Sequence, residues 1–111
     1  MSKVVHFEIG GTDKAKAAGF YGALFGWTFS ETGPATMIEG AGLTGHLNAL
    51  GHEPHNYVVV YVDVDNIEMS VEQAAELGGK ILIGPVAIPN GKIAWIQDPT
   101  GTTIGLWEQA R

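Results

Sequence analysis

The sequence predicts an α+β fold of two tandem βαβββ modules, in which curved mixed sheets enclose a cleft and one helix covers each sheet. The main observation is an internal repeat, because a repeated unit fixes the architecture before any motif is considered. At a shift of 53 residues, Val5 aligns with Val58 and Gly26 with Gly79, and both copies have the same order of element types. Within each copy the apolar period also changes from two residues to three or four.

Each copy begins with a strand that leads into a helix. Apolar residues alternate over residues 3–9 and 57–64, which predicts the two strands. Good N-cap residues then mark where the helices begin: Thr12, Asp13, Asp65 and Asn66. Apolar residues recur at helical spacing in both segments: Ala17, Ala18, Tyr21, Leu24 and Phe25, then Ile67, Val71, Ala74 and Leu77. Gly26 ends the first helix and Gly78-Gly79 the second, as C′ residues do.

Three short strand-like runs follow each helix. They cover residues 27–31, 35–39 and 43–47 in the first copy, and 80–86, 92–97 and 103–108 in the second. Asn90-Gly91 is a hairpin signal, and Asp98 to Gly101 has the residue types of a type I turn. The polar segment of residues 51–56 is the expected linker. We therefore expect a single domain over residues 1–111, with one module at about 1–50 and the other at about 57–111.

Composition limits the class of protein. With 111 residues, of which 45% are hydrophobic, the chain suits one core. It has 12 acidic and 6 basic residues, and the basic ones are scattered, so a nucleic-acid partner is not expected. It lacks cysteine and long apolar segments, and it begins without the pattern of a signal peptide. We expect a soluble cytoplasmic protein with no membrane partner.

Five phrases carry a family resemblance: "VHFEI", "FYGALFGW", "YVDVDNIE", "ELGGK" and "DPTGTTIGLWE". In this order and spacing the chain resembles the vicinal oxygen chelate superfamily, which holds the glyoxalases, bleomycin-resistance proteins and extradiol dioxygenases. The resemblance covers essentially the whole chain. It implies paired βαβββ modules with a cleft, a homodimer, and in the enzymes a divalent metal held by His or Glu side chains from the first and last strand of each module.

Most of the expected metal ligands are missing from this sequence. His6 matches the first-strand ligand, but the three other positions hold Val59, Gly45 and Gly105. One imidazole does not hold a divalent ion against water, so no metal cofactor is expected. A relocated site of His6, His46 and Glu108 is the alternative, although period-2 alternation turns Glu108 away from the face of Gly105. His46 is otherwise a satisfied strand histidine, and His52 and His55 belong to the solvated linker.

The same alternation predicts the walls of the cleft. Val5, Phe7 and Ile9 should pack under the first helix, and Val58, Val60 and Val62 under the second. The opposite parity places eight residues as ligand-binding candidates: His6, Glu8, Tyr57, Val59, Tyr61, Trp95, Gly105 and Trp107. Trp95 fits either face, and the strand glycines are expected to widen the cleft. Each aromatic residue has plain core packing as its alternative.

These residues predict a metal-free protein that binds an aromatic or cationic small molecule, similar to the drug-sequestering bleomycin-resistance members and so linked to antibiotic resistance. Aromatic walls suit stacking and cation–π contact, and the net charge of −6 favours cations. Two alternatives remain. One is a glyoxalase- or isomerase-like lyase, either with the relocated metal or with His6 and Glu8 as a general base pair. The other is a structural or interaction module whose cleft is filled. A homodimer is expected because so small a domain leaves sheet edges to cover.

Overall fold

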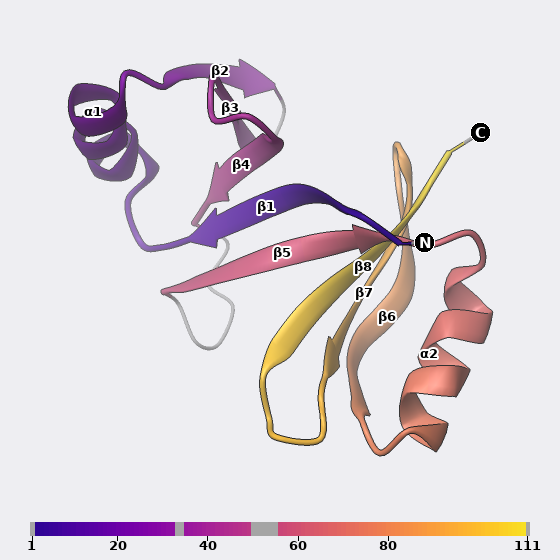
Figure 1. The fold of residues 1–111 in the computed structure, drawn as a ribbon. Coiled ribbons are helices and arrows are strands. Elements are labelled where there is room, and N and C mark those ends of the chain that lie inside the picture. The colour runs from indigo at the N-terminus through magenta and orange to yellow at the C-terminus, as the bar shows by residue number, and fades with distance from the viewer. Residues whose placement is uncertain (1, 33–34, 50–55, 111) are drawn as a thin grey trace. The chain divides into compact units, whose positions relative to one another are not determined.

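The computed structural model of the chain describes residues 2–32, 35–49 and 56–110 (Figure 1). The first module contains β1 (Val4–Gly10), α1 (Lys14–Phe25), β2 (Thr28–Thr32), β3 (Ala35–Glu39) and β4 (Thr44–Asn48). The second contains β5 (Tyr57–Asp63), α2 (Ile67–Glu76), β6 (Lys80–Ile88), β7 (Gly91–Gln97) and β8 (Thr103–Gln109). This order confirms the predicted α+β class and the two βαβββ modules. Most of the expected linker lies outside the described residues.

The chain divides into two compact units by its internal contacts. One is His6–Val59, and the other combines Met1–Val5 with Val60–Arg111. In His6–Val59 the strand order is β2-β3-β4-β1, and β1 runs parallel to β4 with His6 paired to Thr44 and Glu8 to His46. This register decides the candidate site, because paired residues of neighbouring strands carry their side chains on the same face of the sheet.

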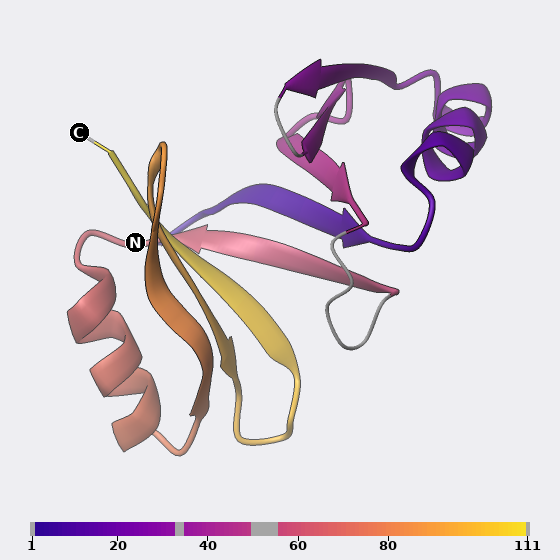
Figure 2. The same ribbon diagram turned by 180° about the vertical axis from the view of Figure 1, so that it is seen from behind.

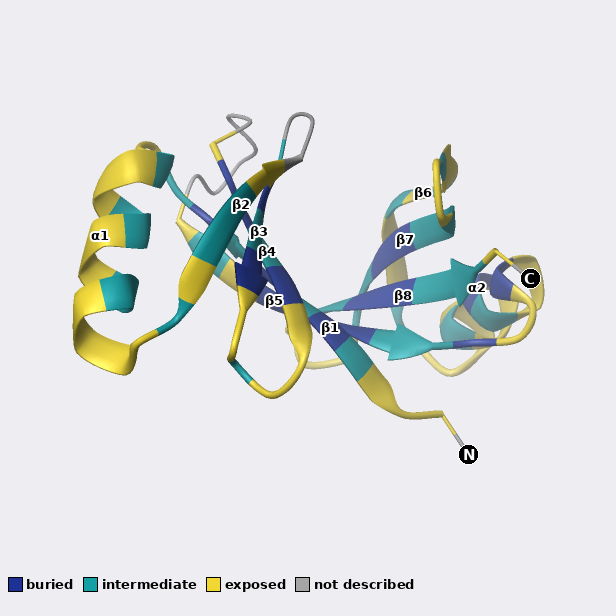
Figure 3. Cartoon of the chain, turned by 90° about the horizontal axis from the view of Figure 1, so that it is seen from above, coloured by how far each residue is buried: buried dark blue, intermediate teal, exposed yellow. Residues whose placement is uncertain are grey.

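Helix α1 begins and ends as its sequence predicts. The Asp13 side chain accepts a hydrogen bond from the backbone N–H of Lys16 at 3.0 Å, and Gly26 closes the helix with φ of +76°. No residue of α1 is fully buried (Figure 3). Leu24 and Phe25, two of the apolar residues that recur at helical spacing, are 59% and 55% exposed. The helix instead contributes to an aromatic cluster: Phe7, Phe20, Tyr21, Phe25 and Trp27.

The second unit has the strand order β5-β8-β7-β6, with β5 parallel to β8 and antiparallel pairs elsewhere. Helix α2 lies against β6, β7 and β8 (Figure 2). Its N-cap is Asn66, whose side chain accepts from the backbone N–H of Met69 at 3.1 Å. The core beneath it contains apolar residues from the helix, from β7 and β8 and from the connection between β5 and α2: Val64, Ile67, Val71, Ala94 and Leu106, with Val62 and Ile96 packed against them.

The predicted turns of the second module are present. β6 and β7 form a hairpin that turns just before Gly91, and the backbone N–H of Gly101 bonds the carbonyl of Asp98 at 2.9 Å. The Asp98 carboxylate also accepts from the backbone N–H groups of Thr100 and Thr102. Among the described residues, no helix has the length and apolar content needed to cross a membrane.

Candidate functional site

A buried carboxylate, Glu8, lies at the centre of a polar network in the unit His6–Val59. Its side chain comes from β1 and is only 4% exposed. The Tyr57 hydroxyl from β5 donates to Oε2, and the Asn48 amide from β4 donates to the same oxygen at 2.5 Å. His46 Nε2, also from β4, lies 3.5 Å from Oε1. The two strands that flank β1, β4 and β5, therefore bring hydrogen-bond donors to one carboxylate, which is what makes its burial tolerable.

Two histidines extend this network along the sheet. His6 Nε2 lies 2.7 Å from His46 Nδ1, and His6 Nδ1 lies 2.7 Å from Thr44 Oγ1. One set of tautomers satisfies every contact: the Thr44 hydroxyl donates to His6, His6 Nε2–H to His46, and His46 Nε2–H points to Glu8. Each donated hydrogen then points along this series of contacts toward the Glu8 carboxylate, because an ionised carboxylate can only accept hydrogen bonds.

The electrostatics of the network keep both imidazoles neutral near pH 7. Burial is the main cause that lowers the pKa of His6 to about 4; repulsion from a charged His46 adds to this and attraction to Glu8 opposes it. Burial likewise lowers the pKa of His46 against the same attraction. Burial, and next the bond to Glu8, raise the pKa of Tyr57 far above its usual range, so this phenol keeps its proton.

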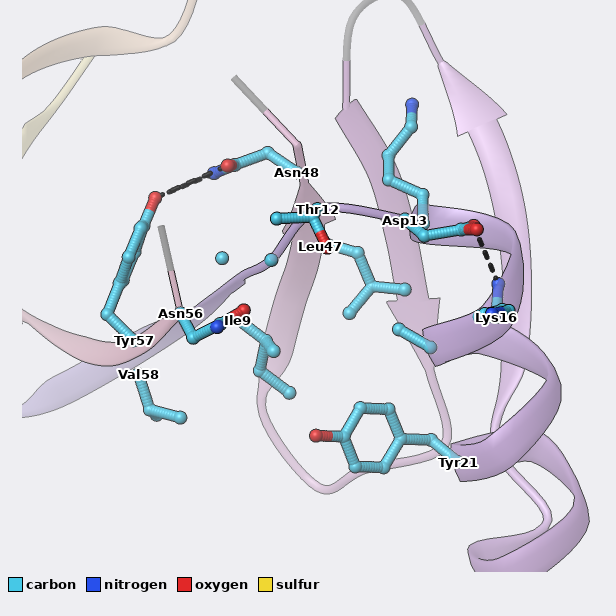
Figure 4. Close-up of a pocket in the computed structure, with 14 residues that line it drawn as sticks. Ile9, Thr12, Asp13, Lys16, Tyr21, Leu47, Asn48, Asn56, Tyr57 and Val58 are labelled. Atoms are coloured by element: carbon cyan, nitrogen blue, oxygen red, sulfur yellow. Dashed lines mark hydrogen bonds between the residues drawn. The ribbon is translucent and has the colours of Figure 1, made fainter. Parts of the chain in front are cut away.

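A pocket of about 530 Å³ opens at the carboxyl ends of β1 and β4, beside the start of α1 (Figure 4). Ile9, Leu47 and the ring of Tyr21 form apolar parts of its lining, and Tyr57 and Asn48 stand together on the opposite wall. Tyr57 lies over Gly10, where a Cβ would fall 2.1 Å from the ring, so only glycine leaves room for this tyrosine. The pocket and the Glu8 network therefore share two residues.

Two predicted aromatic residues of the second module, Tyr61 and Trp95, contact each other in the other unit. Trp95 Nε1 donates to the Tyr61 hydroxyl at 2.8 Å, and both side chains are buried. A Cβ on Gly105 would lie 2.5 Å from Tyr61 Cδ1, so the ring fills the space that the glycine leaves. Trp107 Nε1 donates to the carbonyl of Asn90 at 3.1 Å.

The strand glycines were expected to widen the cleft. This expectation was wrong, because aromatic rings of the neighbouring strands fill the space beside them. Gly45 repeats the arrangement, since a Cβ there would lie 2.5 Å from Phe7 Cε1. Val58, expected in the core, is 66% exposed and lines the pocket instead. Val59 is buried at 3% exposure.

The metal that the resemblance implies does not fit the residues present. Both ring nitrogens of His6 are already engaged, and Val59, Gly45 and Gly105 carry no donor atom. Over residues 2–32, 35–49 and 56–110, no group of three or more His, Asp or Glu side chains is placed to hold a metal ion. In the alternative metal site of His6, His46 and Glu108, only the two histidines contact each other. The Glu108 carboxylate instead accepts a hydrogen bond from the backbone N–H of Ile67 at 3.0 Å. His52 and His55 lie outside the described residues.

Of the eight predicted site residues, His6, Glu8, Tyr57 and Val59 belong to one unit, and Tyr61, Trp95, Gly105 and Trp107 to the other. Sequence reasoning missed Asn48 and Thr44, which complete the network, and Tyr21, which lines the pocket. Asn48 could have been found, because it follows His46 by two residues on the same strand and so shares its face.

The chain matches the family model described as "Glyoxalase/Bleomycin resistance protein/Dioxygenase superfamily" over residues 3–106. "Putative glyoxylase CFP32" of Mycobacterium tuberculosis is 29% identical to it, over 90% of this chain and 43% of the relative. "Anthracycline biosynthesis protein DnrV" of Streptomyces peucetius is 23% identical to it, over 93% of this chain and 46% of the relative. The chain thus spans less than half the length of these curated relatives.

Solved structures share the fold. Methylmalonyl-CoA epimerase from Mycobacterium tuberculosis superposes with a TM-score of 0.68 and 17% identity, covering 97% of this chain and 88% of the epimerase. Two βαβββ modules, each built on a short run of mixed parallel and antiparallel strands, define the structural class. The family match over nearly the whole chain makes the protein a member of the glyoxalase/bleomycin-resistance/dioxygenase superfamily, which confirms the predicted family.

Proposed function

We propose that this protein binds a small molecule, as bleomycin-resistance members of the superfamily do, and holds an aromatic or cationic compound without a divalent metal. The observation that carries the proposal is the pocket of about 530 Å³ at the ends of β1 and β4. Its volume suits a small organic ligand, and it combines apolar side chains with a few polar groups, as ligand sites usually do.

The rings in the pocket support an aromatic ligand. Tyr21 from α1 and Tyr57 from β5 both belong to its lining, and Ile9 and Leu47 add apolar surface between them. Offset stacking on a tyrosine contributes about 0.5 to 1.5 kcal/mol beyond the burial of area. The net charge of −6 and the buried Glu8 support a cationic group on the ligand.

The histidines support binding without a metal. His6 donates through Nε2 and accepts through Nδ1 within the network, so a metal would have to displace Thr44 or His46. The relatives named as a glyoxylase and an epimerase leave a lyase or isomerase as the competing function. Metal content separates the two, because such a lyase would retain about one ion for each site.

Two measurements test the proposal. Thermal shift against a panel of aromatic and cationic compounds should find hits, since a ligand at about 100 times its Kd adds roughly 2.7 kcal/mol. Ala17→Trp, which fills the pocket from α1, should abolish binding, whereas Ala23→Trp on the exposed part of the same helix should not. Absence of any hit, equal effects of the two tryptophans, or a stoichiometric metal retained after dialysis would overturn the proposal.

A further inference from the structure

We infer that Tyr21 orients the ligand by donating a hydrogen bond from its hydroxyl, and that the ligand is a neutral aromatic carbonyl compound. The inference rests on the proposed function, takes its aromatic alternative and names the class of ligand for the same pocket. It depends on which polar side chains of the lining are already bonded within the protein and which remain for a ligand.

The polar groups of Tyr57 and Asn48 are bonded to each other and to Glu8. The Tyr57 hydroxyl donates to Glu8 and accepts from the Asn48 amide at 3.1 Å. The Asn48 amide also donates to Glu8, and its oxygen lies 3.3 Å from the Tyr57 hydroxyl. A ligand that bonded either side chain would displace one of these contacts beside a buried carboxylate, and that loss would offset the new hydrogen bond.

The Tyr21 hydroxyl, in contrast, points from α1 into the pocket (Figure 4). In the part of the chain that the structure describes, the Tyr21 ring contacts other aromatic rings, but its hydroxyl has no hydrogen-bond partner. A ligand can therefore bond this hydroxyl by displacing water alone, which leaves every protein contact intact.

Three aromatic neighbours hold the Tyr21 ring in place. Phe20 meets it edge-on with the ring centroids 5.4 Å apart, and Phe25 lies nearly parallel to it at 6.1 Å. Trp27 lies at 5.7 Å from the same ring. A ring that is already held loses little conformational freedom when a ligand binds, so the direction of its hydroxyl can select the orientation of the ligand.

The α1 side of the pocket favours a hydrogen-bond acceptor on the ligand. Lys16 also lines the pocket, and its ammonium group can only donate. A ligand acceptor therefore suits both Lys16 and Tyr21, whereas a ligand donor suits Tyr21 alone. Thr12 and Asn56 carry groups that donate and accept, so they favour neither polarity.

The charged groups beside the pocket favour a neutral ligand. Lys16 and Asp13 are both exposed and have opposite signs, so their charges largely cancel, and water and salt screen the remainder. The Asp13 carboxylate already accepts from the backbone N–H of Lys16 at 3.0 Å. Lys14 forms an ion pair with Glu31 at 3.6 Å. A carbonyl oxygen on an aromatic compound meets both conditions, because it accepts hydrogen bonds and carries no net charge.

Three naphthalene compounds with one carbon skeleton test the inference by equilibrium dialysis at pH 7. 2-Acetylnaphthalene carries the carbonyl, 2-isopropylnaphthalene has a methyl group in place of the oxygen, and 1-(2-naphthyl)ethylamine has a protonated amine there. Tyr21→Phe should weaken binding of the ketone about fivefold, the equivalent of one hydrogen bond of about 1 kcal/mol. It should change binding of the hydrocarbon and of the amine by less than about twofold, since neither presents an acceptor.

Tyr57→Phe is the comparison at the other tyrosine of the pocket, and it should affect the three compounds alike, because its hydroxyl is bonded to Glu8. If this variant does not fold, the three compounds on Tyr21→Phe still decide, since that change removes no hydrogen bond from the described chain.

Equal losses for the ketone and the hydrocarbon in Tyr21→Phe overturn the inference, because Tyr21 then contributes only its ring. A loss largest for the amine, or a loss specific to the ketone in Tyr57→Phe, overturns it as well. Failure of all three compounds to bind has the same consequence. The compound panel with Ala17→Trp judges the proposed function separately, so a panel compound that binds independently of the Tyr21 hydroxyl leaves that function standing.

Discussion

His6 Nε2 and His46 Nδ1 face one another at 2.7 Å, with the ring centroids 5.0 Å apart. A contact this short needs one shared proton, because two N–H groups pointing at each other would repel. Burial lowers the pKa of both rings, so the pair is neutral near pH 7, and a proton added at His6 Nδ1 would change the Thr44 hydroxyl from donor to acceptor. The pH dependence of folding should report this directly.

Stability should fall as the pH drops from about 6.5 toward about 4. The pKa of His6 is lowered from 6.5 to about 4 on folding, so between these values the unfolded chain binds more protons and acid favours unfolding. The full shift corresponds to roughly 3 kcal/mol, but solvent screens this partly exposed ring, so we expect a loss of about 2 kcal/mol, to which His46 should add in the same direction. Urea unfolding measured from pH 7.5 to 4.5 tests this. His6→Asn should flatten the profile, and an unchanged slope would assign the effect to other groups.

Gly105→Ala should destabilise the protein by about 1 to 3 kcal/mol, because the new methyl group would lie 2.5 Å from the buried ring of Tyr61. Gly19→Ala is the matched control. A Cβ there meets nothing within 4 Å in the exposed face of α1, so it should stabilise by about 0.5 to 1 kcal/mol. Chemical denaturation of both variants checks the contrast, and equal effects would show that the ring moves aside at little cost.

Tyr61→Phe should cost about 1 to 3 kcal/mol, because it leaves the buried indole N–H of Trp95 without the acceptor at 2.8 Å. The paired change Tyr61→Phe with Trp95→Phe should cost less than the sum of the single changes, since it removes donor and acceptor together. Unfolding curves for the four proteins give the coupling energy. Strict additivity would mean that the bond contributes nothing.

The repeat and its turns could be predicted from sequence because they depend on local physics. The N-caps Asp13 and Asn66, the helix stop at Gly26 and the turn at Asp98 each act within a few residues, and all lie where expected. Packing on α1 could not be predicted from its apolar spacing. Leu24 and Phe25 fit a helical face, but spacing shows only which residues share a face and not whether another element covers it.

The candidate site depends on pairing between distant strands, which alternation alone does not give. Period 2 correctly put His6 and Glu8 on one face, but only the parallel register of β1 and β4 brings His46 opposite Glu8. Glycine at positions 45 and 105 suggested empty space, whereas rings from the neighbouring strands occupy it. A glycine in a strand therefore does not predict a cavity unless the side chain at the paired position of the neighbouring strand is known.

Glu8→Gln should lower the pKa of His6 below about 4, because the negative charge of Glu8 is what opposes burial and holds that pKa up. The pKa of His46 should fall for the same reason. NMR titration of the two imidazole rings measures both values, and Glu31→Gln, on β2 of the same unit and not among the causes of either shift, serves as the control. Unchanged histidine titration in Glu8→Gln, or an equal fall in Glu31→Gln, would mean that the carboxylate does not control the pair.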